Sequence, residues 1–267
     1  MVDKYQREIN TIRISVTDRC NLRCFYCYEE YQYLKKEDLL SFEEIVSIIK
    51  ECVKLGIKRV KLTGGEPLIR KDIDILIKMI SEIKGIEDIS ITTNGVLLND
   101  MAFKLKKANL SRINVSLDTL NPQKYKEITK IGEFDIVIKG LMKAKELFFK
   151  KIKINTVLLK NINENEIQDI KKFASDNDFD FQLINQMNLK KDKNFSENIE
   201  TNKPLSCKFC NRIRLTSNGM LLPCLFSEKS INIREYSDYK IALKECINLK
   251  PEKGEKNNKL SMIQIGG

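Results

Sequence analysis

The sequence predicts an α/β fold: an incomplete TIM-type barrel of six strand-helix units, followed by a smaller C-terminal lobe. Between residues 12 and 184, short β-branched runs alternate with longer segments of helical period, which is typical of a parallel sheet wrapped by helices. After residue 185 this alternation stops and a polar stretch begins. We therefore expect the barrel in residues 1–187 and the lobe in residues 188–267.

The expected strands are short runs rich in Ile, Val and Thr. They are residues 12–17, 58–63, 88–93, 112–117, 152–159 and 179–184. A complete TIM barrel has about eight such units, so a barrel that lacks the last two is open on one side, where a substrate can enter. In barrels of this kind the functional residues lie at the C-terminal ends of the strands, where the following loops gather.

The segment SFEEIVSIIKECVKLG, between the first two strands, is expected to be a helix. Ser41 and Glu44 form a capping box at its start, and apolar residues recur at steps of three and four from Ile45 onward. Cys52 lies on that apolar stripe, so we interpret it as a core thiol rather than a metal ligand.

The amino-acid composition limits the class of protein and the side chains that can hold a metal. The chain of 267 residues is 42% apolar, enough to fill one hydrophobic core. The start MVDKYQREIN is polar and no apolar run approaches the ~18 residues of a membrane span, so we expect a cytoplasmic protein without a membrane segment. The eight cysteines are then expected to be metal ligands or buried thiols rather than disulfides. Histidine is absent, so any metal must be held by sulfur or oxygen.

The formal charge is +10, from 47 Lys and Arg against 37 Asp and Glu. Such a charge suits a polyanionic partner, for example a nucleotide, a nucleic acid or an acidic peptide. The lysines are scattered and form no continuous basic block, so a solvated surface is the simpler interpretation. A metal-stapled nucleic-acid-binding protein is a distant alternative, and we regard nucleic acid as an unlikely partner.

Three cysteines follow the first expected strand in the loop TDRCNLRCFYC. Cys20, Cys24 and Cys27 are separated by three and two residues. A structural zinc site closes with four ligands, whereas an iron-sulfur cube held by three thiolates leaves one iron open to an exchangeable ligand. In a chain without histidine the cluster is the favoured interpretation, and zinc or incidental thiols are the alternative.

The segment CNLRCFYC resembles the C-x-x-x-C-x-x-C loop of the radical S-adenosylmethionine (SAM) superfamily. The resemblance implies a 4Fe-4S cluster whose open iron binds the amino and carboxylate groups of SAM. One electron then cleaves the C5′ to sulfur bond and yields methionine and a 5′-deoxyadenosyl radical. The resemblance continues in LTGGEP, where Gly64 and Gly65 allow close approach of the backbone. Glu66 is expected to accept a hydrogen bond from the ammonium group of SAM.

A second set of cysteines, Cys207, Cys210 and Cys224, has spacings of two and thirteen residues. It either finds a fourth ligand elsewhere or leaves one metal position open. Cys246 is a candidate for the fourth ligand of a zinc knuckle. It follows helical spacing in the segment YKIALKECI, however, so we expect a packed thiol there and an open position in the metal site.

Between these cysteines, Arg212 and Arg214 bring two guanidinium groups, which are suited to bidentate contact with a phosphate or a base edge. With CNRIRLT and PCLF, this segment resembles the C-terminal cluster of the GTP 3′,8-cyclases, the MoaA family of molybdenum cofactor biosynthesis. The resemblance implies a second 4Fe-4S cluster, whose unique iron binds the guanine ring of GTP. It also implies hydrogen abstraction from C3′ of GTP, attack of that carbon on C8, and formation of 3′,8-cyclo-7,8-dihydro-GTP.

The resemblance further implies roles for individual residues. Those expected to bind GTP are Arg13, Lys61, Thr92, Lys153, Arg212, Ile213 and Arg214. Those expected to bind SAM are Tyr26, Gly64, Gly65, Glu66, Ser116 and Met187. The ending IQIGG resembles the family's terminal Gly-Gly, which enters the active site. Gly266 and Gly267 are therefore expected to act in catalysis together with Arg212 and Arg214.

The chain departs from the family pattern in three places. Lys61 stands where the family usually has an arginine, which keeps the charge but loses the planar fork. Gln182 takes the place of another arginine, so that charge is gone. Only twenty positions separate Met187 from Cys207, several dozen fewer than usual, so we expect a wider or differently shaped substrate pocket.

We therefore expect a radical SAM lyase that acts on GTP. The expected partners are an electron donor such as flavodoxin or ferredoxin and the downstream cyclic pyranopterin monophosphate synthase, and a homodimer is a further expectation. The main alternative is a radical SAM enzyme that matures a peptide, or acts on another substrate, with one auxiliary cluster. Gln182 and the short segment before Cys207 favour that alternative, whereas NRIR and the Gly-Gly tail favour the cyclase.

Overall fold

The computed structural model describes residues 1–28, 30, 32–147, 149–190 and 206–266, which form a nine-stranded sheet in the order β6-β5-β4-β3-β2-β1-β7-β8-β9. The strands are β1 Thr11–Ser15, β2 Arg59–Thr63, β3 Asp88–Thr93, β4 Arg112–Ser116, β5 Lys151–Leu158, β6 Asp180–Asn185, β7 Arg212–Leu215, β8 Met220–Leu222 and β9 Ile231–Asn232. Neighbours from β6 to β7 in this order are parallel, and β8 is antiparallel to both β7 and β9.

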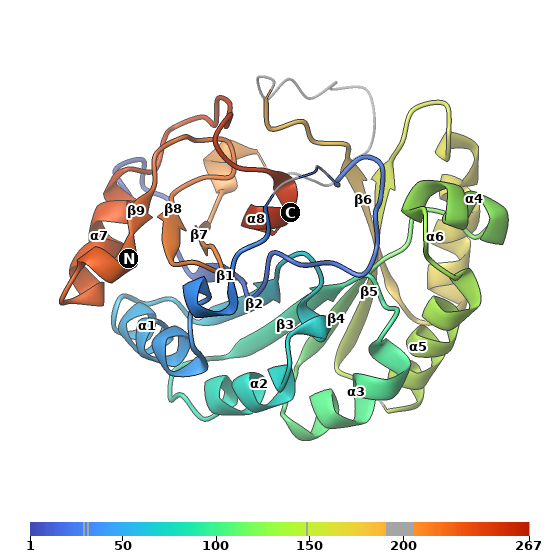
Figure 1. The fold of residues 1–267 in the computed structure, drawn as a ribbon, viewed down its shortest axis with the longest axis horizontal. Helices are drawn as coiled ribbons and strands as arrows, with labels where there is room; N and C mark the ends of the chain where they lie inside the picture. The colour runs from blue at the N-terminus through green and yellow to red at the C-terminus, as the bar shows by residue number, and fades with distance from the viewer. Residues whose placement is uncertain (29, 31, 148, 191–205, 267) are drawn as a thin grey trace.

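Most of the α-helices of the described residues cover the outside of this sheet (Figure 1). The α-helices of the described residues are α1 Phe42–Lys54, α2 Ile73–Ser81, α3 Leu98–Lys107, α4 Pro122–Thr129, α5 Phe134–Glu146, α6 Ile167–Asp176, α7 Tyr239–Asn248 and α8 Met262–Ile265. Figure 1 shows the sheet as a curved wall with α1, α2, α3, α5 and α6 along its convex face, whereas the short α8 lies on the concave side. The predicted α/β class and open barrel are confirmed.

The predicted strands are confirmed, with bounds that differ by at most two residues. The predicted helix is α1, and its capping box is present: Ser41 Oγ accepts from the amide of Glu44 at 3.1 Å, and Glu44 Oε2 accepts from the amide of Ser41 at 2.7 Å. Cys52 on α1 and Cys246 on α7 are both fully buried in the core. Both are therefore packed thiols, as their helical spacing predicted.

Side chains alternate between the two faces of the sheet, and this alternation creates a polar interior. On β1, Ile12 and Ile14 are fully buried in the core between sheet and helices, whereas Arg13 lines a cavity on the concave side. On β2, Lys61 and Thr63 line the same cavity. The hydrophobic core therefore lies between the sheet and its helices, and the inside of the curve is left for polar groups.

The C-terminal part of the chain continues the sheet on its other edge. β7 pairs in parallel with β1, so that Arg212 lies opposite Thr11 and Arg214 opposite Arg13. β8 and β9 extend the edge as an antiparallel meander. The predicted domain boundary after residue 187 stays a prediction, because residues 191–205, most of the polar stretch that motivated it, lie outside the described residues.

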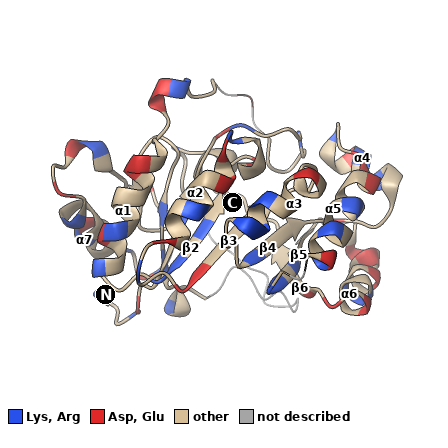
Figure 2. Cartoon of the chain, turned by 90° about the horizontal axis from the view of Figure 1, so that it is seen from below, with Lys and Arg blue, Asp and Glu red and all other residues tan. Residues whose placement is uncertain are grey.

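Charges of both signs share the outer surface. Figure 2 shows Lys and Arg interspersed with Asp and Glu along the helices, and exposed ion pairs join them, for example Lys58 to Glu87 at 2.8 Å and Lys78 to Glu82 at 3.2 Å. This distribution agrees with the solvated surface expected from the scattered lysines. In the described part of the chain, every helix is too short or too polar to cross a membrane.

The two glycines after β2 pass close under the loop that follows β1. The amide of Gly65 donates to the carbonyl of Thr17 at 2.8 Å, and a Cβ added at Gly65 would lie 2.2 Å from the carbonyl oxygen of Arg19. A Cβ added at Gly64 would lie 2.4 Å from the carbonyl oxygen of Thr17. Any larger residue must therefore push the two loops apart.

We predict that Gly65→Ala lowers the free energy of unfolding by about 2–4 kcal/mol, because backbone atoms on both sides must move. Urea unfolding of the metal-free chain measures this. Gly219→Ala is the control: Gly219 has a φ of +93°, but its added Cβ has no neighbour nearer than 3.4 Å, so only a backbone cost of about 1 kcal/mol is expected. Equal losses in both variants would contradict the close approach.

Candidate active site

The concave side of the sheet holds a cavity of about 270 Å³ in which most of the predicted site residues meet. The predicted residues that line it are Arg13, Cys20, Cys24, Tyr26, Cys27, Lys61, Gly64, Gly65, Thr92, Ser116, Lys153, Met187, Arg212 and Arg214. They come from β1 to β5, from β7 and from the loops after β1, β2 and β6. Residues so distant in sequence meet because the carboxyl ends of parallel strands lie at one edge of a sheet.

Ile213 does not join them. Its neighbours Arg212 and Arg214 line the cavity, and successive strand residues point to opposite faces. The side chain of Ile213 is fully buried in the hydrophobic core on the helix side. A contact between this side chain and GTP is therefore excluded, whereas a contact through the backbone of Ile213 stays a prediction.

The first three cysteines lie in one folded loop, which hydrogen bonds hold. The amide of Cys27 donates to the carbonyl of Cys24 at 3.0 Å. Two donors approach the sulfur of Cys20: the amide of Leu22 at 3.4 Å and Nδ2 of Asn94 at 3.8 Å. Hydrogen bonds to sulfur are among the means by which proteins tune iron-sulfur clusters. Three thiols on one cavity wall with N–H donors to sulfur fit a 4Fe-4S cluster, and Asn94 is a residue that the sequence analysis missed.

Glu66 lies beside this loop and bonds to the protein itself. Its carboxylate accepts from the amide of Leu68 at 2.9 Å, from Oγ1 of Thr93 at 2.7 Å and from the amide of Asn94 at 2.7 Å. Burial raises the pKa of Glu66 to about 7, although these hydrogen bonds act in the opposite direction. Its observed contacts tie the GGEP loop to the end of β3, and the contact with SAM stays a prediction.

Tyr26, between two of the cysteines, is oriented by a carboxylate that the sequence analysis also missed. Its hydroxyl donates to Oδ2 of Asp118 at 2.6 Å, and the amide of Val157 donates to Oδ1 of Asp118 at 2.7 Å. Burial raises the pKa of Asp118 to about 6. The available signal was its position just after β4, at the edge of the sheet where functional residues gather.

Three cations on neighbouring strands form a row across one wall of the cavity, here called the basic row. Arg13 on β1 stands in register between Arg214 on β7 and Lys61 on β2. Burial and repulsion by Arg214 and Arg212 hold the pKa of Arg13 well below its ordinary value. Burial and repulsion by Arg212 lower the pKa of Arg214 to about 10. A bound anion relieves this repulsion, so the basic row suits phosphate groups.

Further polar residues line the cavity on β4 to β6. Arg112 and Asn114 on β4 alternate with core residues and end in the predicted Ser116. Because side chains alternate along a strand, the strand prediction is enough to identify both residues as facing the cavity. The sequence analysis nevertheless missed them. Lys153 on β5 lies 3.8 Å from the carboxylate of Asp180. Gln182 on β6, where an arginine was expected, also lines the cavity.

The second set of cysteines surrounds a smaller cavity of about 60 Å³. Arg212, Arg214 and Leu225 line both cavities, so the two sites share a wall. Cys207, Cys210 and Cys224 all line this smaller cavity. Three thiols at one place are the donor set that a cube with one open iron needs.

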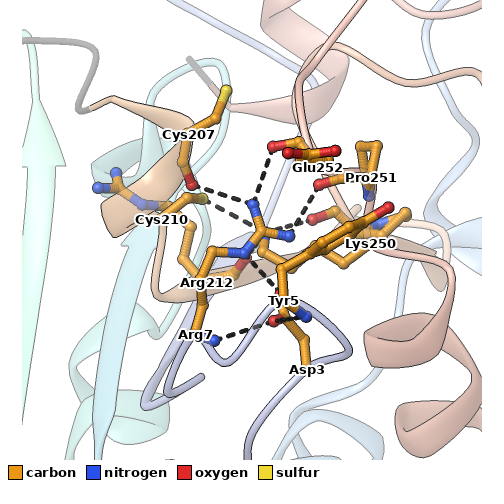
Figure 3. Close-up of polar contacts among 10 residues, drawn as sticks. Asp3, Tyr5, Arg7, Cys207, Cys210, Arg212, Lys250, Pro251 and Glu252 are labelled. Carbon is orange, nitrogen blue, oxygen red and sulfur yellow. Dashed lines mark hydrogen bonds and ion pairs between the residues drawn. The ribbon is translucent and has the colours of Figure 1, made fainter.

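Two buried basic residues support the second site, and the sequence analysis missed both (Figure 3). Lys250 donates from Nζ to Sγ of Cys210 at 3.3 Å, and also to the carbonyls of Arg212 and Pro223. Burial acts to raise the pKa of the Cys210 thiol, but the Lys250 ammonium, together with the amide and the guanidinium of Arg212, lowers the pKa below its ordinary value. Burial raises the pKa of the Cys224 thiol. Bound iron deprotonates a coordinating thiol in either case.

Arg7 is the second of these residues. Its Nε donates to Oδ2 of Asp3 at 2.7 Å, Nη1 donates to the carbonyl of Cys207 at 3.0 Å, and Nη2 donates to the carbonyl of Pro251 at 2.7 Å. Both Arg7 and Asp3 are buried. The N-terminal segment, to which the sequence analysis assigned no role, is therefore part of the second site.

The C-terminal tail reaches the same place. The carbonyl of Gly266 accepts from Nη1 of Arg214 at 2.9 Å. Gly266 has a φ of +73°, and a Cβ added there would lie 2.4 Å from Cγ2 of Thr63. The predicted partner Gly267 lies outside the described residues.

Comparison with known proteins agrees with this geometry. The family model of the Radical SAM superfamily matches residues 14–174. The GTP 3′,8-cyclase of Clostridium botulinum (strain Langeland) is 40% identical over 319 aligned positions, which cover 100% of both chains. The GTP 3′,8-cyclase of Petrotoga mobilis is 38% identical over 324 positions, again with 100% of both chains covered. The chain belongs to the GTP 3′,8-cyclase family of radical SAM enzymes. The resemblance drawn from the sequence is confirmed.

The family alignments also bear on chain length. They run over 319 and 324 positions, whereas this chain has 267 residues, so these cyclases carry segments that this chain lacks. The Campylobacter jejuni relative (strain 81116), 37% identical over 310 positions and covered to 95% of its length, follows the same pattern. That the missing residues belong between Met187 and Cys207 stays a prediction.

Solved structures share the fold at lower identity. SuiB of Streptococcus suis bound to S-adenosylmethionine has a TM-score of 0.67 and 21% identity, and the match covers 88% of this chain and 65% of SuiB. Native anSMEcpe with bound AdoMet has a TM-score of 0.62 and 18% identity, with 91% and 81% covered. At these identities the likeness establishes a shared partial barrel.

We predict that Arg7→Met lowers the free energy of unfolding by about 3–5 kcal/mol, because it leaves the carboxylate of Asp3 buried without its partner. It should also remove iron from the second site, since Cys207 and Pro251 lose their shared donor. Urea unfolding and iron per chain after anaerobic reconstitution measure both effects. Lys4→Met is the control, because Lys4 is exposed. Full iron content in Arg7→Met would contradict the role in the second site.

We predict that the stability of the metal-free chain falls as the pH rises from about 4.5 to about 7. Glu66 has a folded pKa of about 7 against an ordinary value of 4.5, so in this window the folded chain holds a proton that the unfolded chain has lost. The slope reaches about 1.4 kcal/mol per pH unit for one such group. Urea unfolding of the wild type and of Glu66→Gln at pH 5 and pH 8 measures it. An unchanged pH dependence in Glu66→Gln would refute the assignment.

Proposed function

We propose that this chain converts GTP to 3′,8-cyclo-7,8-dihydro-GTP, the first step of molybdopterin biosynthesis. The observation that carries the proposal is a single cavity with one three-cysteine site on its wall, a second three-cysteine site next to it, and cations at their shared boundary. A nucleotide substrate needs contacts for its phosphates and for its base, and this arrangement offers both. The full-length cyclase relatives support the same activity.

Cys20, Cys24 and Cys27 would hold the first 4Fe-4S cluster, and Cys207, Cys210 and Cys224 would hold the second. When bound, the first cluster and SAM supply a one-electron reductive cleavage of SAM and the radical that abstracts hydrogen. The residues of the chain then have to bind GTP, orient its ribose and keep other reactants out.

The basic row would bind the triphosphate. Arg13 and Arg214 offer planar forks for bidentate contacts, and Lys61 offers a compact charge on the next strand. Thr92, Lys153 and Arg212 add polar contacts from the other walls of the same cavity. Gln182 contributes no charge on β6, so the basic row on β7, β1 and β2 carries more of the anion than it would with an arginine there.

The base of GTP would lie at the boundary of the two cavities, beside Arg212. Three cysteines leave one position of a cube open, which suits a nitrogen or oxygen of guanine. The bond from Arg214 to the carbonyl of Gly266 fixes one arm of the guanidinium at this boundary. The tail would thereby orient Arg214 toward the nucleotide, which would give Gly266 its proposed catalytic role, while the role proposed for Gly267 follows from the terminal Gly-Gly motif alone.

On the side of the first cysteines, Gly64, Gly65, Ser116 and Met187 would bind SAM. The bond to Asp118 holds the ring of Tyr26 against the cysteine loop. Apolar side chains in the same lining, among them Leu22, Val157, Leu225 and Met262, exclude water from the reacting atoms. Radical chemistry depends on such exclusion, because a reactive intermediate must not meet a quencher.

The remaining partners are proposals that follow from this activity. They are flavodoxin or ferredoxin as electron donor, the cyclic pyranopterin monophosphate synthase that acts next, a homodimeric state and a cytoplasmic location. The peptide-maturing alternative is favoured by Gln182 and by the short segment before Cys207. The likeness to structures such as SuiB bound to the precursor peptide SuiA, at 22% identity, concerns the fold alone. The interspersed surface charges favour neither that alternative nor nucleic-acid binding (Figure 2).

The test is mass spectrometry of the anaerobically reconstituted, reduced protein incubated with SAM, with and without GTP. We predict 5′-deoxyadenosine whose formation GTP stimulates, and a product with the mass of GTP that degrades to a pterin. If 5′-deoxyadenosine forms while GTP stays untouched, the substrate is another molecule and the proposal is wrong.

A combined Cys207→Ala, Cys210→Ala and Cys224→Ala variant tests the second site in the same assay. It should lose about half of the bound iron and all cyclisation, while slow cleavage of SAM without GTP turnover persists, because the first cysteines are intact. Cys246→Ala is the matched control, since it removes a thiol that packs in the core. Unchanged iron in the combined variant would exclude these cysteines as ligands.

A further inference from the structure

Lys250 places a buried ammonium group directly behind the second set of cysteines (Figure 3). The residue follows α7 and is only 1% exposed. Its Nζ donates to Sγ of Cys210 at 3.3 Å, to the carbonyl of Arg212 at 2.7 Å and to the carbonyl of Pro223 at 2.8 Å. An ammonium group has three donors, and all three are used.

These three acceptors belong to the two halves of the cysteine set. Cys210 lies two residues before β7, Arg212 is the first residue of β7, and Pro223 immediately precedes Cys224. Lys250 therefore links the segment that carries the first two cysteines to the segment that carries the third. One side chain fixes both segments, although Lys250 lies 27 positions after Pro223.

The charge of Lys250 also needs an explanation. Two of its acceptors are carbonyls and the third is a sulfur, so none of them is a carboxylate that would compensate a buried ammonium. Burying a charge without compensation is costly. Three thiolates bound to a cube would bring negative charge to this place and would compensate the ammonium group.

We propose that Lys250 is a positioning residue of the second cluster, which holds Cys210 in place and raises the reduction potential of that cluster. The inference rests on the proposed second cluster. A positive charge and an N–H donor at a cluster sulfur both favour the reduced form, which carries one more electron. Partners behind the ligands commonly tune a metal site in this way.

The first cysteine loop offers a contrast within the same molecule. The donors to Cys20 are the amide of Leu22 and the side-chain amide of Asn94, both neutral. Cys210 has a charged donor at shorter distance than Asn94. We therefore expect the second cluster to accept an electron at a higher potential than the first.

The experiment isolates the second cluster by replacing Cys20, Cys24 and Cys27 with alanine. In this background Lys250→Met, Lys250→Gln and the control Lys244→Met are compared, since Lys244 on α7 is exposed and its loss changes the net charge equally. The readouts are iron per chain, urea unfolding of the metal-free chain, and the midpoint potential from a dithionite titration followed by electron paramagnetic resonance.

We predict that Lys250→Met lowers the midpoint by at least the equivalent of a tenfold change in the ratio of reduced to oxidised cluster, about 59 mV for one electron. Lys250→Gln keeps an N–H donor but loses the charge, so its midpoint potential should fall between those of Lys250→Met and the background. The midpoint potential of Lys244→Met should equal that of the background. A normal midpoint with full iron in Lys250→Met would overturn the proposal. So would loss of iron from both Lys250 variants together with unfolding at lower urea, which indicates a purely structural role.

Loss of iron from both variants without any change in urea unfolding supports the positioning role. The parent background separates this inference from the proposed function. If the chain without the first three cysteines binds no iron while it stays folded, the second cluster itself is absent, and the proposed function fails before Lys250 is tested.

Discussion

The parallel pairing of β7 with β1 is the contact on which the two-site arrangement depends. The chain leaves the barrel at β6, on one edge of the sheet, and returns at β7 on the opposite edge. The register sets Arg214 beside Arg13 and leaves Ile213 and Leu215 fully buried on the helix side. Burial of these apolar side chains fixes the register, because a slip by one residue would turn them toward the polar cavity and turn the arginines into the apolar core. The second cysteines lie next to the cavity for this reason.

This pairing gathers cations that repel one another, and the rest of the fold holds them there. The lowered pKa values of Arg13 and Arg214 reflect the unfavourable free energy of burying these positive charges close together. The apolar core behind β1 and β7, and the bond from Arg214 to the tail, offset it. Proteins commonly accept such local strain where a ligand will later supply the missing charge. The basic row is therefore better explained by a bound anion than by stability.

Features that depend on residues close together in the sequence could be predicted. Contacts between residues far apart in the sequence could not. Strand periodicity, the capping box at Ser41 and the cysteine spacings each depend on a few adjacent residues. Arg7 and Cys207 are 200 positions apart, and Tyr26 and Asp118 are 92 positions apart. A lone arginine or aspartate has no periodic pattern that would identify its partner. The side chain of Ile213 is out of reach of the cavity for another reason: a motif identifies neighbours in sequence, whereas the strand sends alternate residues to opposite faces.

The tail shows how a motif gains a physical reason once its surroundings are known. Two independent constraints require glycine at position 266: a φ of +73°, which side chains disfavour, and an approach to Thr63 that a Cβ would block at 2.4 Å. The close approach lies at the end of β2, next to the basic row. The carbonyl that this conformation presents is the one that Arg214 binds. The tail, the basic row and the second site therefore meet in one guanidinium group, so a change in any of them reaches the others through Arg214.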